Sequence, residues 1–255
     1  MTTASSIPRR LTAYAFAPKD GVHEHVDVER VSDLLKTESL VWLDVTDPQP
    51  EDVDMLRQEL GLHPLGLEEI MVEHPRPKLL EFAESYALVI YAAGRDESGK
   101  LDLREVTIFV GRNFLVTAHC GRLPEIEECL QRWRTASGIP LESIAAPFYS
   151  LLDTIIDGYF PLVDGLAESY EDLEDSIFSG AGVPQAANLF EHKKDMLTLR
   201  RVLTAERDAL NQLLRQDVQI LPVSSIIYFQ SVYDHIVRLV ETVDTYRDLL
   251  SSDRR

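Results

Sequence analysis

Hydrophobic residues form a regular repeat along the C-terminal segment of the chain, residues 224–255. They recur alternately three and four positions apart, which is the spacing of an a/d seam on an α-helix. The seam consists of Phe229, Val232, Ile236, Leu239, Val243, Tyr246 and Leu250. No Gly or Pro interrupts it, so the pattern predicts one helix, roughly 48 Å long at a rise of about 1.5 Å per residue. The seam either packs inside its own domain or belongs to a stalk helix that contacts other copies of the chain.

The helical pattern reaches almost to Arg255 without a capping signal. A Gly, Asn or Pro usually marks the end of a helix. We therefore expect the helix to continue in a segment that follows this chain, with an apolar run of about 20 residues.

Helical periods also dominate the preceding stretch. They predict helices over 147–178 and 184–217, joined by a turn in which Gly ends one helix and Pro184 begins the next. Pro161 is expected to kink the first of them. The two helices form a long hairpin, and the C-terminal helix follows it.

The N-terminal half alternates short strand-like and helix-like segments. Runs rich in Val, Ile, Leu and aromatic residues are bounded by turn residues and predict strands. These runs are 11–16, 40–45, 86–93, 106–111 and 114–118. Amphipathic segments predict helices over 26–36, 48–60 and 123–136. Turn residues at 97–100 and 111–113 indicate tight antiparallel connections.

These elements predict an α+β fold. Residues 1–146 form an α/β regulatory subdomain with a mostly antiparallel sheet flanked by helices. Residues 147–255 form a long-helix subdomain, with the hairpin over 147–217 and the stalk over 224–255.

The chain is strongly acidic, with a formal net charge of −18. This balance argues against nucleic-acid binding and against adsorption on anionic lipid, and it makes cations the natural small partners. The longest uncharged run, 218–233, contains Pro and several polar residues, so it does not predict a membrane span, and the chain as given is expected to be soluble. Cys120 and Cys129 form no CxxC pattern, which indicates neither a disulfide framework nor a zinc ribbon and favours a reducing compartment.

Carboxylates line the first long helix, and no Lys or Arg occurs from Thr135 to His192. The acidic residues are Asp153, Asp157, Asp164, Glu168, Glu171, Asp172, Glu174 and Asp175. Like charges one helical turn apart destabilise a helix by a few tenths of a kcal/mol per pair. We expect ion pairs with the returning helix to neutralise much of this stripe and to leave an acidic tip over 171–175. The basic residues available are Lys193, Lys194, Arg200, Arg201 and Arg207.

Other chemical signals are weak. His23 and His25 alternate as on a strand and suit a transition metal, but no third ligand is adjacent, which favours surface histidines. The sequence contains no GxGxxG, P-loop, GxSxG or HExxH pattern, so these motifs indicate no enzyme.

Two segments of the C-terminal helix, Tyr228–His235 and Glu241–Ser251, closely resemble the stalk helix of the CorA-type magnesium transporters. Three further motifs occur in the family's order and approximate spacing. They are Arg76-Pro77-Lys78 before a strand, Asp153 to Asp157 with Tyr159-Phe160-Pro161, and Leu199-Arg200-Arg201. The resemblance covers about residue 40 to the end of the chain.

The resemblance implies the cytoplasmic regulatory domain of a homopentameric divalent-cation channel of the cell (inner) membrane. The stalk would run on into the first transmembrane helix, and the pore signature and second membrane helix are not in this chain. In the family, divalent cations bound between neighbouring cytoplasmic domains hold the pore shut. Mg²⁺ is the implied regulatory ligand, with Co²⁺ or Zn²⁺ as alternatives, and the chemistry suits Mg²⁺ because it binds through one or two carboxylates and keeps several waters.

Carried over residue by residue, the family's acidic pair falls on Glu68 and Glu69. The partner acid on the stalk falls on Ser231, a departure that removes one carboxylate from the intersubunit contact. A second cation position falls on Asp153 and His235. Without the resemblance, each of these residues is equally well explained as a polar residue on a helix surface. The expected stalk interface comprises Ser231 with Phe229, Val232, Ile236, Leu239 and Val243.

Three functions remain open. They are the gating domain of a magnesium channel, the equivalent domain of the related zinc-transporting branch, and a stand-alone metal-dependent hydrolase that uses the acidic tip. Zinc favours His and Cys, which are scattered here, so the chemistry favours magnesium. A hydrolase needs convergent carboxylates and a catalytic base, whereas these acids lie along a rod, so we expect no enzyme.

Overall fold

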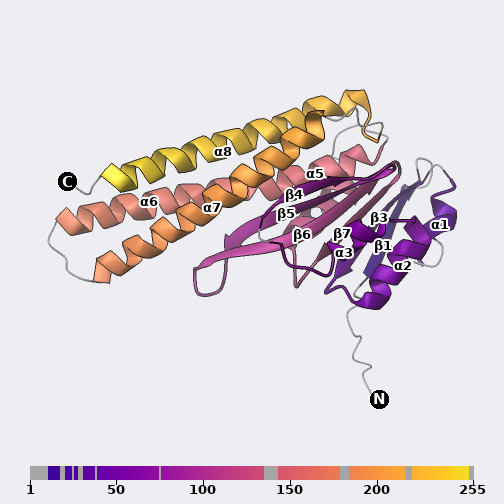
Figure 1. Ribbon diagram of the computed structural model, residues 1–255, viewed down its shortest axis with the longest axis horizontal. Helices are drawn as coiled ribbons and strands as arrows, with labels where there is room; N and C mark the ends of the chain where they lie inside the picture. The colour runs from indigo at the N-terminus through magenta and orange to yellow at the C-terminus, as the bar shows by residue number, and fades with distance from the viewer. Residues whose placement is uncertain are drawn as a thin grey trace, which may run out of the picture.

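The computed structural model describes residues 11–17, 21–24, 26–27, 31–37, 39–74, 76–134, 143–178, 184–215 and 220–252. Figure 1 shows two parts, a twisted sheet with short helices and a set of long helices that extends beyond it. This confirms the predicted α+β class.

One seven-stranded sheet forms the N-terminal part, with the strand order β2-β1-β3-β7-β6-β5-β4. Its strands are β1 (Leu11–Ala17), β2 (Gly21–Glu24), β3 (Leu40–Thr46), β4 (Lys78–Glu81), β5 (Ser85–Arg95), β6 (Leu101–Gly111) and β7 (Phe114–His119). All neighbours are antiparallel except β3 and β7, which are parallel. The expected mostly antiparallel sheet is therefore confirmed.

The two predicted tight connections join β5 to β6 and β6 to β7. Asp96 Oδ1 accepts hydrogen bonds from the backbone N–H groups of Ser98 and Lys100, at 2.8 and 3.0 Å. Gly99 has a φ of 81°, which an L side chain rarely adopts. This turn fixes the register of the two longest strands.

Short helices cover one face of the sheet. They are α1 (Val31–Leu34), α2 (Pro50–Leu60) and α3 (Pro64–Glu68). Leu56 and Leu67 from these helices pack with Val41, Leu43 and Phe109 of the sheet in one hydrophobic core. The predicted helices over 26–36 and 48–60 thus correspond to α1 and α2, with later starts.

The opposite face carries α4 (Pro124–Arg134) and the long helices. Trp42, between Val41 and Leu43 on β3, points to this second core, as the period-two alternation of a strand requires. Phe148 and Phe229 from the helices join it, with ring centroids 5.3 Å apart. A core on each face explains why the central strands are nearly continuous hydrophobic runs.

The long helices are α5 (Ala145–Asp157), α6 (Tyr159–Phe178), α7 (Pro184–Arg215) and α8 (Ile226–Ser252), with a 3₁₀ turn η2 (Val223–Ser225) before α8. The first predicted helix is interrupted at Gly158, between α5 and α6. The ring of a proline clashes with the carbonyl four residues before it, which is that of Asp157 for Pro161, so the interruption agrees with the kink expected from Pro161.

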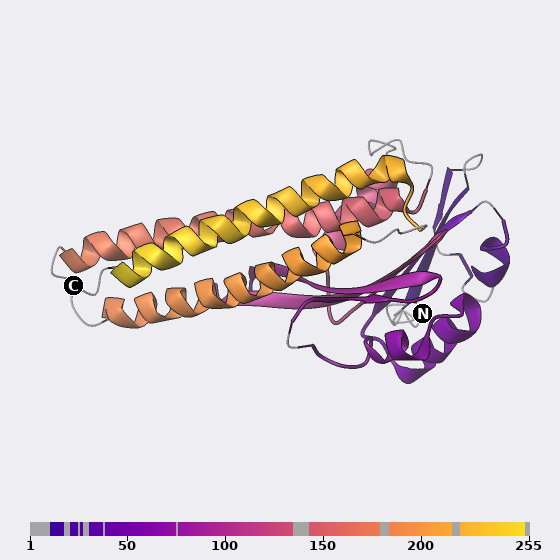
Figure 2. The ribbon, with the colours of Figure 1, turned by 45° about the horizontal axis from the view of Figure 1, so that its top comes forward.

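Five residues of the hydrophobic seam of α8 are buried within their own chain. Phe229, Val232, Ile236, Leu239 and Val243 are at most 1% exposed and pack with α5, α6 and α7. Figure 2 shows α8 lying along the other long helices. These five side chains are therefore not available to a neighbouring copy in this structure. Of the expected stalk interface, only Ser231 is exposed.

The expected ion pairs between α6 and α7 are not formed among the side chains that the structure describes. Arg200 on α7 donates from Nε to Asp244 Oδ1 on α8 at 2.5 Å, and Arg207 pairs with Asp208 on its own helix. Asp164 and Glu168 have no ion pair with α7 in the described region. The reason is that α7 packs closely on α8 and turns Arg200 toward it.

Two expectations fall outside what is described. The side chains of the acidic tip, 171–175, and residue His25 of the proposed histidine pair are not described. Within the described part of the chain, none of the helices has both the length and the apolar character needed to cross a membrane.

Candidate divalent-cation site

Two carboxylates and an imidazole converge where α5 packs against α8. Asp153 and Asp157 lie one turn apart on α5, and His235 comes from α8. One ligand atom from each of the three lies within 4.8 Å of the others. His235 Nδ1 lies 3.1 Å from Asp157 Oδ1. This arrangement suits a divalent cation, because carboxylates are ligands for Mg²⁺ and an imidazole also suits Co²⁺ and Zn²⁺.

The local sequence places these side chains. On α5 the buried residues Leu152, Ile155 and Ile156 face the core, which turns the two aspartates toward the outer face. His235 precedes the buried Ile236 on α8. Its ring stands edge-on to Phe160, with centroids 5.7 Å apart. The site is thus at the rim of a packed helix contact and stays open to solvent.

The two carboxylates of the site repel each other. Burial raises the pKa of the Asp153 carboxyl group, and the nearby Asp157 charge raises it further. Tyr149, His235 and Arg132 act in the opposite direction. Burial and the charge of Asp153 also raise the pKa of the Tyr149 phenol to about 12. A bound cation would relieve the repulsion between the two carboxylates.

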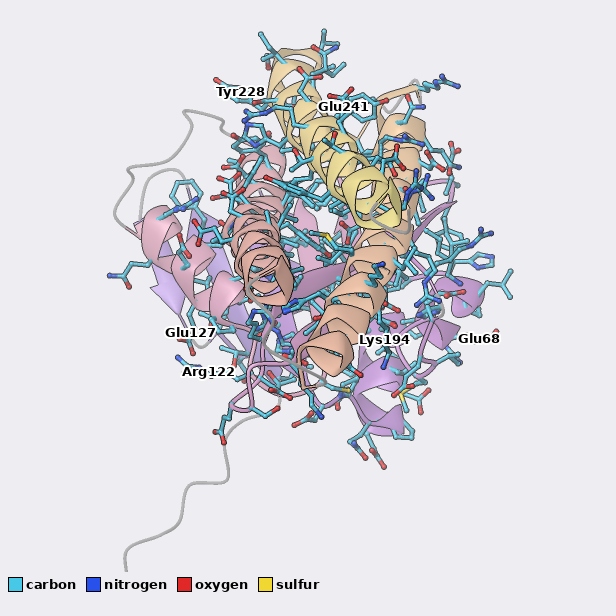
Figure 3. All side chains as sticks on the ribbon, turned by 90° about the vertical axis from the view of Figure 1, so that its left-hand side faces the viewer. Glu68, Arg122, Glu127, Lys194, Tyr228 and Glu241 are labelled. Atoms are coloured by element: carbon cyan, nitrogen blue, oxygen red, sulfur yellow. The ribbon has the colours of Figure 1, made fainter. Side chains whose placement is uncertain are left out.

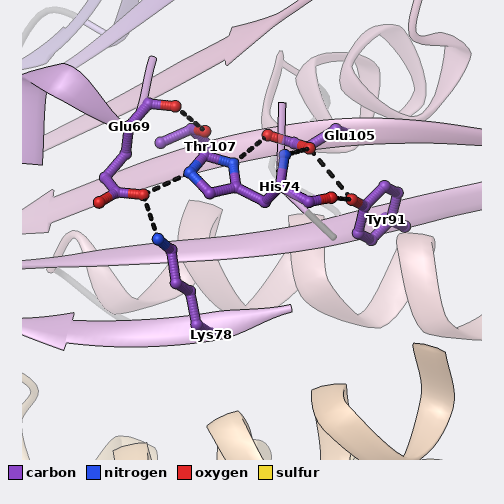
Figure 4. A network of polar contacts seen from close by, with 6 residues as sticks. All are labelled: Glu69, His74, Lys78, Tyr91, Glu105 and Thr107. Carbon is purple, nitrogen blue, oxygen red and sulfur yellow. Dashed lines mark hydrogen bonds and ion pairs between the residues drawn. The ribbon is translucent and has the colours of Figure 1, made fainter. Parts of the chain in front are cut away.

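Glu69, by contrast, is held inside the chain. Its carboxylate contacts Nε2 of His74 and Nζ of Lys78 (Figure 4). The other ring nitrogen of His74, Nδ1, lies 2.5 Å from Glu105 Oε1. The Tyr91 hydroxyl donates to Glu105 Oε2 at 3.1 Å. The network ties the segment after α3 to β4, β5 and β6.

Glu68 differs from its neighbour Glu69 in exposure. It is the last residue of α3 and is exposed, whereas the Glu69 side chain is only 16% exposed. In Figure 3 Glu68 stands at one side of the molecule and Tyr228, three residues before Ser231, stands at another. The structure therefore brings together Asp153 and His235, and it does not bring Glu68, Glu69 and Ser231 together within one chain.

Asp157 is a further ligand candidate that the family motif does not include. The sequence predicts its pairing with a basic residue of α7, but it pairs with His235 on α8. The available signal was the spacing of four between Asp153 and Asp157, which places both carboxylates on one helix face.

Comparisons with known proteins confirm the resemblance found in the sequence. A family model described as "CorA-like Mg2+ transporter protein" matches residues 37–253. The chain is 30% identical over 213 residues to YfjQ of Bacillus subtilis (strain 168), and 26% identical over 229 residues to the cobalt/magnesium transport protein CorA of Thermotoga maritima. The matches cover 84% and 88% of this chain but only 66% and 65% of those relatives.

Solved structures share the fold. The soluble domain of CorA from Methanocaldococcus jannaschii has a TM-score of 0.76 at 20% identity, covering 95% of this chain and 94% of that one. The ZntB cytoplasmic domain from Vibrio parahaemolyticus has a TM-score of 0.74 at 13% identity, covering 94% and 93%. These two likenesses establish architecture, and the family model, which matches most of the chain, establishes kinship. The chain belongs to the CorA-like Mg2+ transporter family.

Proposed function

We propose that this chain is the cytoplasmic cation-sensing domain of a CorA-type magnesium channel, in which bound divalent cation favours the closed pore. The observation that carries the proposal is the convergence of Asp153 and Asp157 on α5 with His235 on α8. The names of the relatives, which include a cobalt/magnesium transport protein, supply the transported ion.

The site suits a sensor because it joins α5 to α8, two helices that also share hydrophobic contacts and the ring contacts of Tyr149 with Tyr228 and Phe229. A cation bound to both aspartates and His235 links α5 to α8. Loss of the cation leaves two carboxylates facing each other and weakens that link. Because α8 is the expected stalk, a change at this rim alters the helix that would lead to the membrane segment.

A second contact would lie between copies. Glu68 and Ser231 are both exposed. In Figure 3 Glu68 stands at one side of the chain, and Tyr228, on the same helix as Ser231, stands at another. When one surface patch of each copy binds a different patch of the next copy, the copies form a closed ring if the rotation between neighbours is a whole fraction of a full turn. A homopentamer requires such a contact. A cation bridging Glu68 of one copy to α8 of the next would then meet a hydroxyl at Ser231 instead of a carboxylate.

One feature favours zinc or cobalt as a second candidate ion. His235 brings an imidazole nitrogen to the cluster, and this ligand is preferred by Zn²⁺ and Co²⁺ over Mg²⁺. The likeness to the ZntB domain adds only the fold.

The test is a thermal melt with Mg²⁺, Co²⁺, Zn²⁺ or a chelator. A cation at 100 times its dissociation constant stabilises the folded state by about 2.7 kcal/mol, so millimolar Mg²⁺ should raise the melting temperature of the wild type. The double variant Asp153→Asn with Asp157→Asn should lose this response. Asp164→Asn, which removes an exposed carboxylate from α6, should keep it.

His235→Asn separates the two candidate ions. It should weaken the response to Zn²⁺ and Co²⁺ more than the response to Mg²⁺, because only the softer ions depend on the imidazole. A double aspartate variant that responds to cations as the wild type does would overturn the proposal.

A further inference from the structure

The edge of strand β5 is left open where β4 ends. Val89 is the last residue of β5 that pairs with β4. Tyr91 lies two residues further on, so its backbone N–H and C=O face the same open edge. The N–H of Tyr91 donates to Glu206 Oε1 on α7 at 2.9 Å. The Tyr159 hydroxyl on α6 donates to the Tyr91 carbonyl at 2.8 Å. Two helix side chains thus complete the edge in place of a strand.

Both of these side chains are fully buried. Glu206 and Tyr159 are each 0% exposed, and Glu206 Oε2 has no hydrogen-bond partner among the described residues. In Figure 1 α7 passes alongside β4 and β5. The contacts of Glu206 with Tyr91 of β5 and Tyr159 of α6 place its carboxyl group between the sheet and the helices. A buried carboxylate without a cation beside it is costly, because the charged form loses its hydration.

No cation compensates this carboxyl group within the described structure. The charged groups that act on the two tyrosines are Arg104 and Glu105 on β6 and Arg201 on α7. Arg104 pairs with Glu125, and Glu105 contacts His74. Arg201 is exposed and is not an ion-pair partner of Glu206.

The number of hydrogens also indicates a neutral carboxyl group. The Tyr159 hydroxyl has one hydrogen, and its oxygen lies 2.8 Å from the Tyr91 carbonyl and 3.2 Å from Glu206 Oε1. If that hydrogen goes to the Tyr91 carbonyl, the second contact needs a hydrogen from Glu206. A proton on Glu206 Oε1 supplies that hydrogen, so the Tyr159 oxygen then makes both contacts as hydrogen bonds, while Glu206 Oε2 stays without a partner among the described residues. An ionised Glu206 would draw the Tyr159 hydrogen to itself and leave the Tyr91 carbonyl unpaired.

We propose that Glu206 is a proton-dependent latch: its protonated carboxyl group completes the open edge of β5 and holds α7 and α6 on the sheet, and its ionisation loosens that junction. Burial raises the pKa of Glu206 to about 8, against the opposing effect of the Tyr91 and Tyr159 hydrogen bonds. The folded-state pKa lies above the unfolded value. The latch therefore contributes its full stability below the unfolded pKa, and this contribution is lost as the pH rises through about 8.

The test is urea unfolding of the whole chain between pH 6 and 9. Glu206→Gln keeps a group of the same shape and removes the titration. Between pH 6 and 7 the unfolding constant of the wild type should increase by close to tenfold relative to this variant, because one proton is bound only in the folded state, and the increase should level off as the pH passes about 8. Glu191→Gln, an exposed glutamate on the same helix, should follow the wild type. Equal pH dependence of wild type and Glu206→Gln would overturn the latch.

A second measurement needs no variant. Hydrogen exchange at the Tyr91 amide, corrected for the intrinsic effect of pH, should lose protection above pH 8, because this amide donates to Glu206. The amide of Val110, on β6 where this strand pairs with both β5 and β7, is the internal control. Protection at Tyr91 that stays constant relative to Val110 across this range would contradict the proposal.

Discussion

The ammonium group of Lys78 lies against the carboxylate of Glu69, so the residue expected to bind a divalent cation already holds a cation from its own chain. His74 approaches the same carboxylate from the other side. A metal ion that uses Glu69 must therefore displace Lys78 or share the carboxylate with it. Glu68, which is exposed, meets no such competitor among the described contacts.

Replacing Lys78 with Gln should release Glu69. Without added cation, the variant should lose about 1 kcal/mol or less of the free energy of unfolding, because the pair is partly exposed. If Glu69 is a ligand, stabilisation by millimolar Mg²⁺ should be larger in the variant than in the wild type. Thermal melts with and without Mg²⁺ measure both effects. Lys194→Gln, on exposed α7 surface, is the control. An unchanged Mg²⁺ response would mean that Glu69 serves only the internal network.

Ser231→Asp should restore a carboxylate to the exposed face of α8. Because Glu68 and the start of α8 lie at different sides of one chain, the added carboxylate can share a cation with Glu68 only between copies. We expect modest stabilisation of the wild type by millimolar Mg²⁺ and a larger gain in the variant, one that increases with protein concentration. Light scattering should show Mg²⁺-dependent association of Ser231→Asp beyond that of the neutral Ser231→Asn. Equal association of the two variants would exclude Ser231 from an intersubunit cation site.

The sequence predicts those features of the fold that depend on local pattern. The strand-like runs became β1, β3, β5, β6 and β7, because each alternates or is continuously hydrophobic over a sufficient length. Strand β2 has four residues, too few for a pattern. The kink expected from Pro161 corresponds to the break at Gly158, because the ring of Pro161 meets the carbonyl of Asp157, four positions earlier.

The candidate site was only partly predictable, because it depends on contacts between residues that are far apart in the sequence. Asp153 and His235 follow from a family motif, but the contact between Asp157 and His235 joins residues 78 positions apart, and only the packing of α5 on α8 creates it. The capture of Glu69 by Lys78 and the burial of Glu206 are likewise tertiary effects. No residue pattern distinguishes a carboxylate that faces solvent from one that is paired inside.

Asp153→Asn should stabilise the chain in the absence of cations at neutral pH. Burial and the charge of Asp157 raise the pKa of Asp153 in the folded state. A raised pKa means stability that is present below the unfolded value and is lost as the pH rises through the folded value, so the ionised form is unfavourable at pH 7. The gain should stay below about 1 kcal/mol, since the site is half exposed to solvent. Urea unfolding in chelator at pH 4 and pH 7 should show a larger difference between variant and wild type at pH 7. A stabilisation that does not depend on pH would contradict this assignment.

Phe229→Ala distinguishes the two possible roles of the α8 seam. Phe229 is 1% exposed and contacts the rings of Phe148 and Tyr149, so its truncation should lower the free energy of unfolding by about 3 to 5 kcal/mol. Ile227→Ala, two residues earlier on the same helix, removes a side chain that is 67% exposed and should change stability by less than about 0.5 kcal/mol. Urea unfolding measures both variants, and light scattering follows their association. If Phe229→Ala left the monomer as stable as the wild type and instead reduced association, the seam would be an interface between copies. Because Phe229 is buried against α5, we expect instead that Phe229→Ala lowers the free energy of unfolding of the single chain and leaves association unchanged.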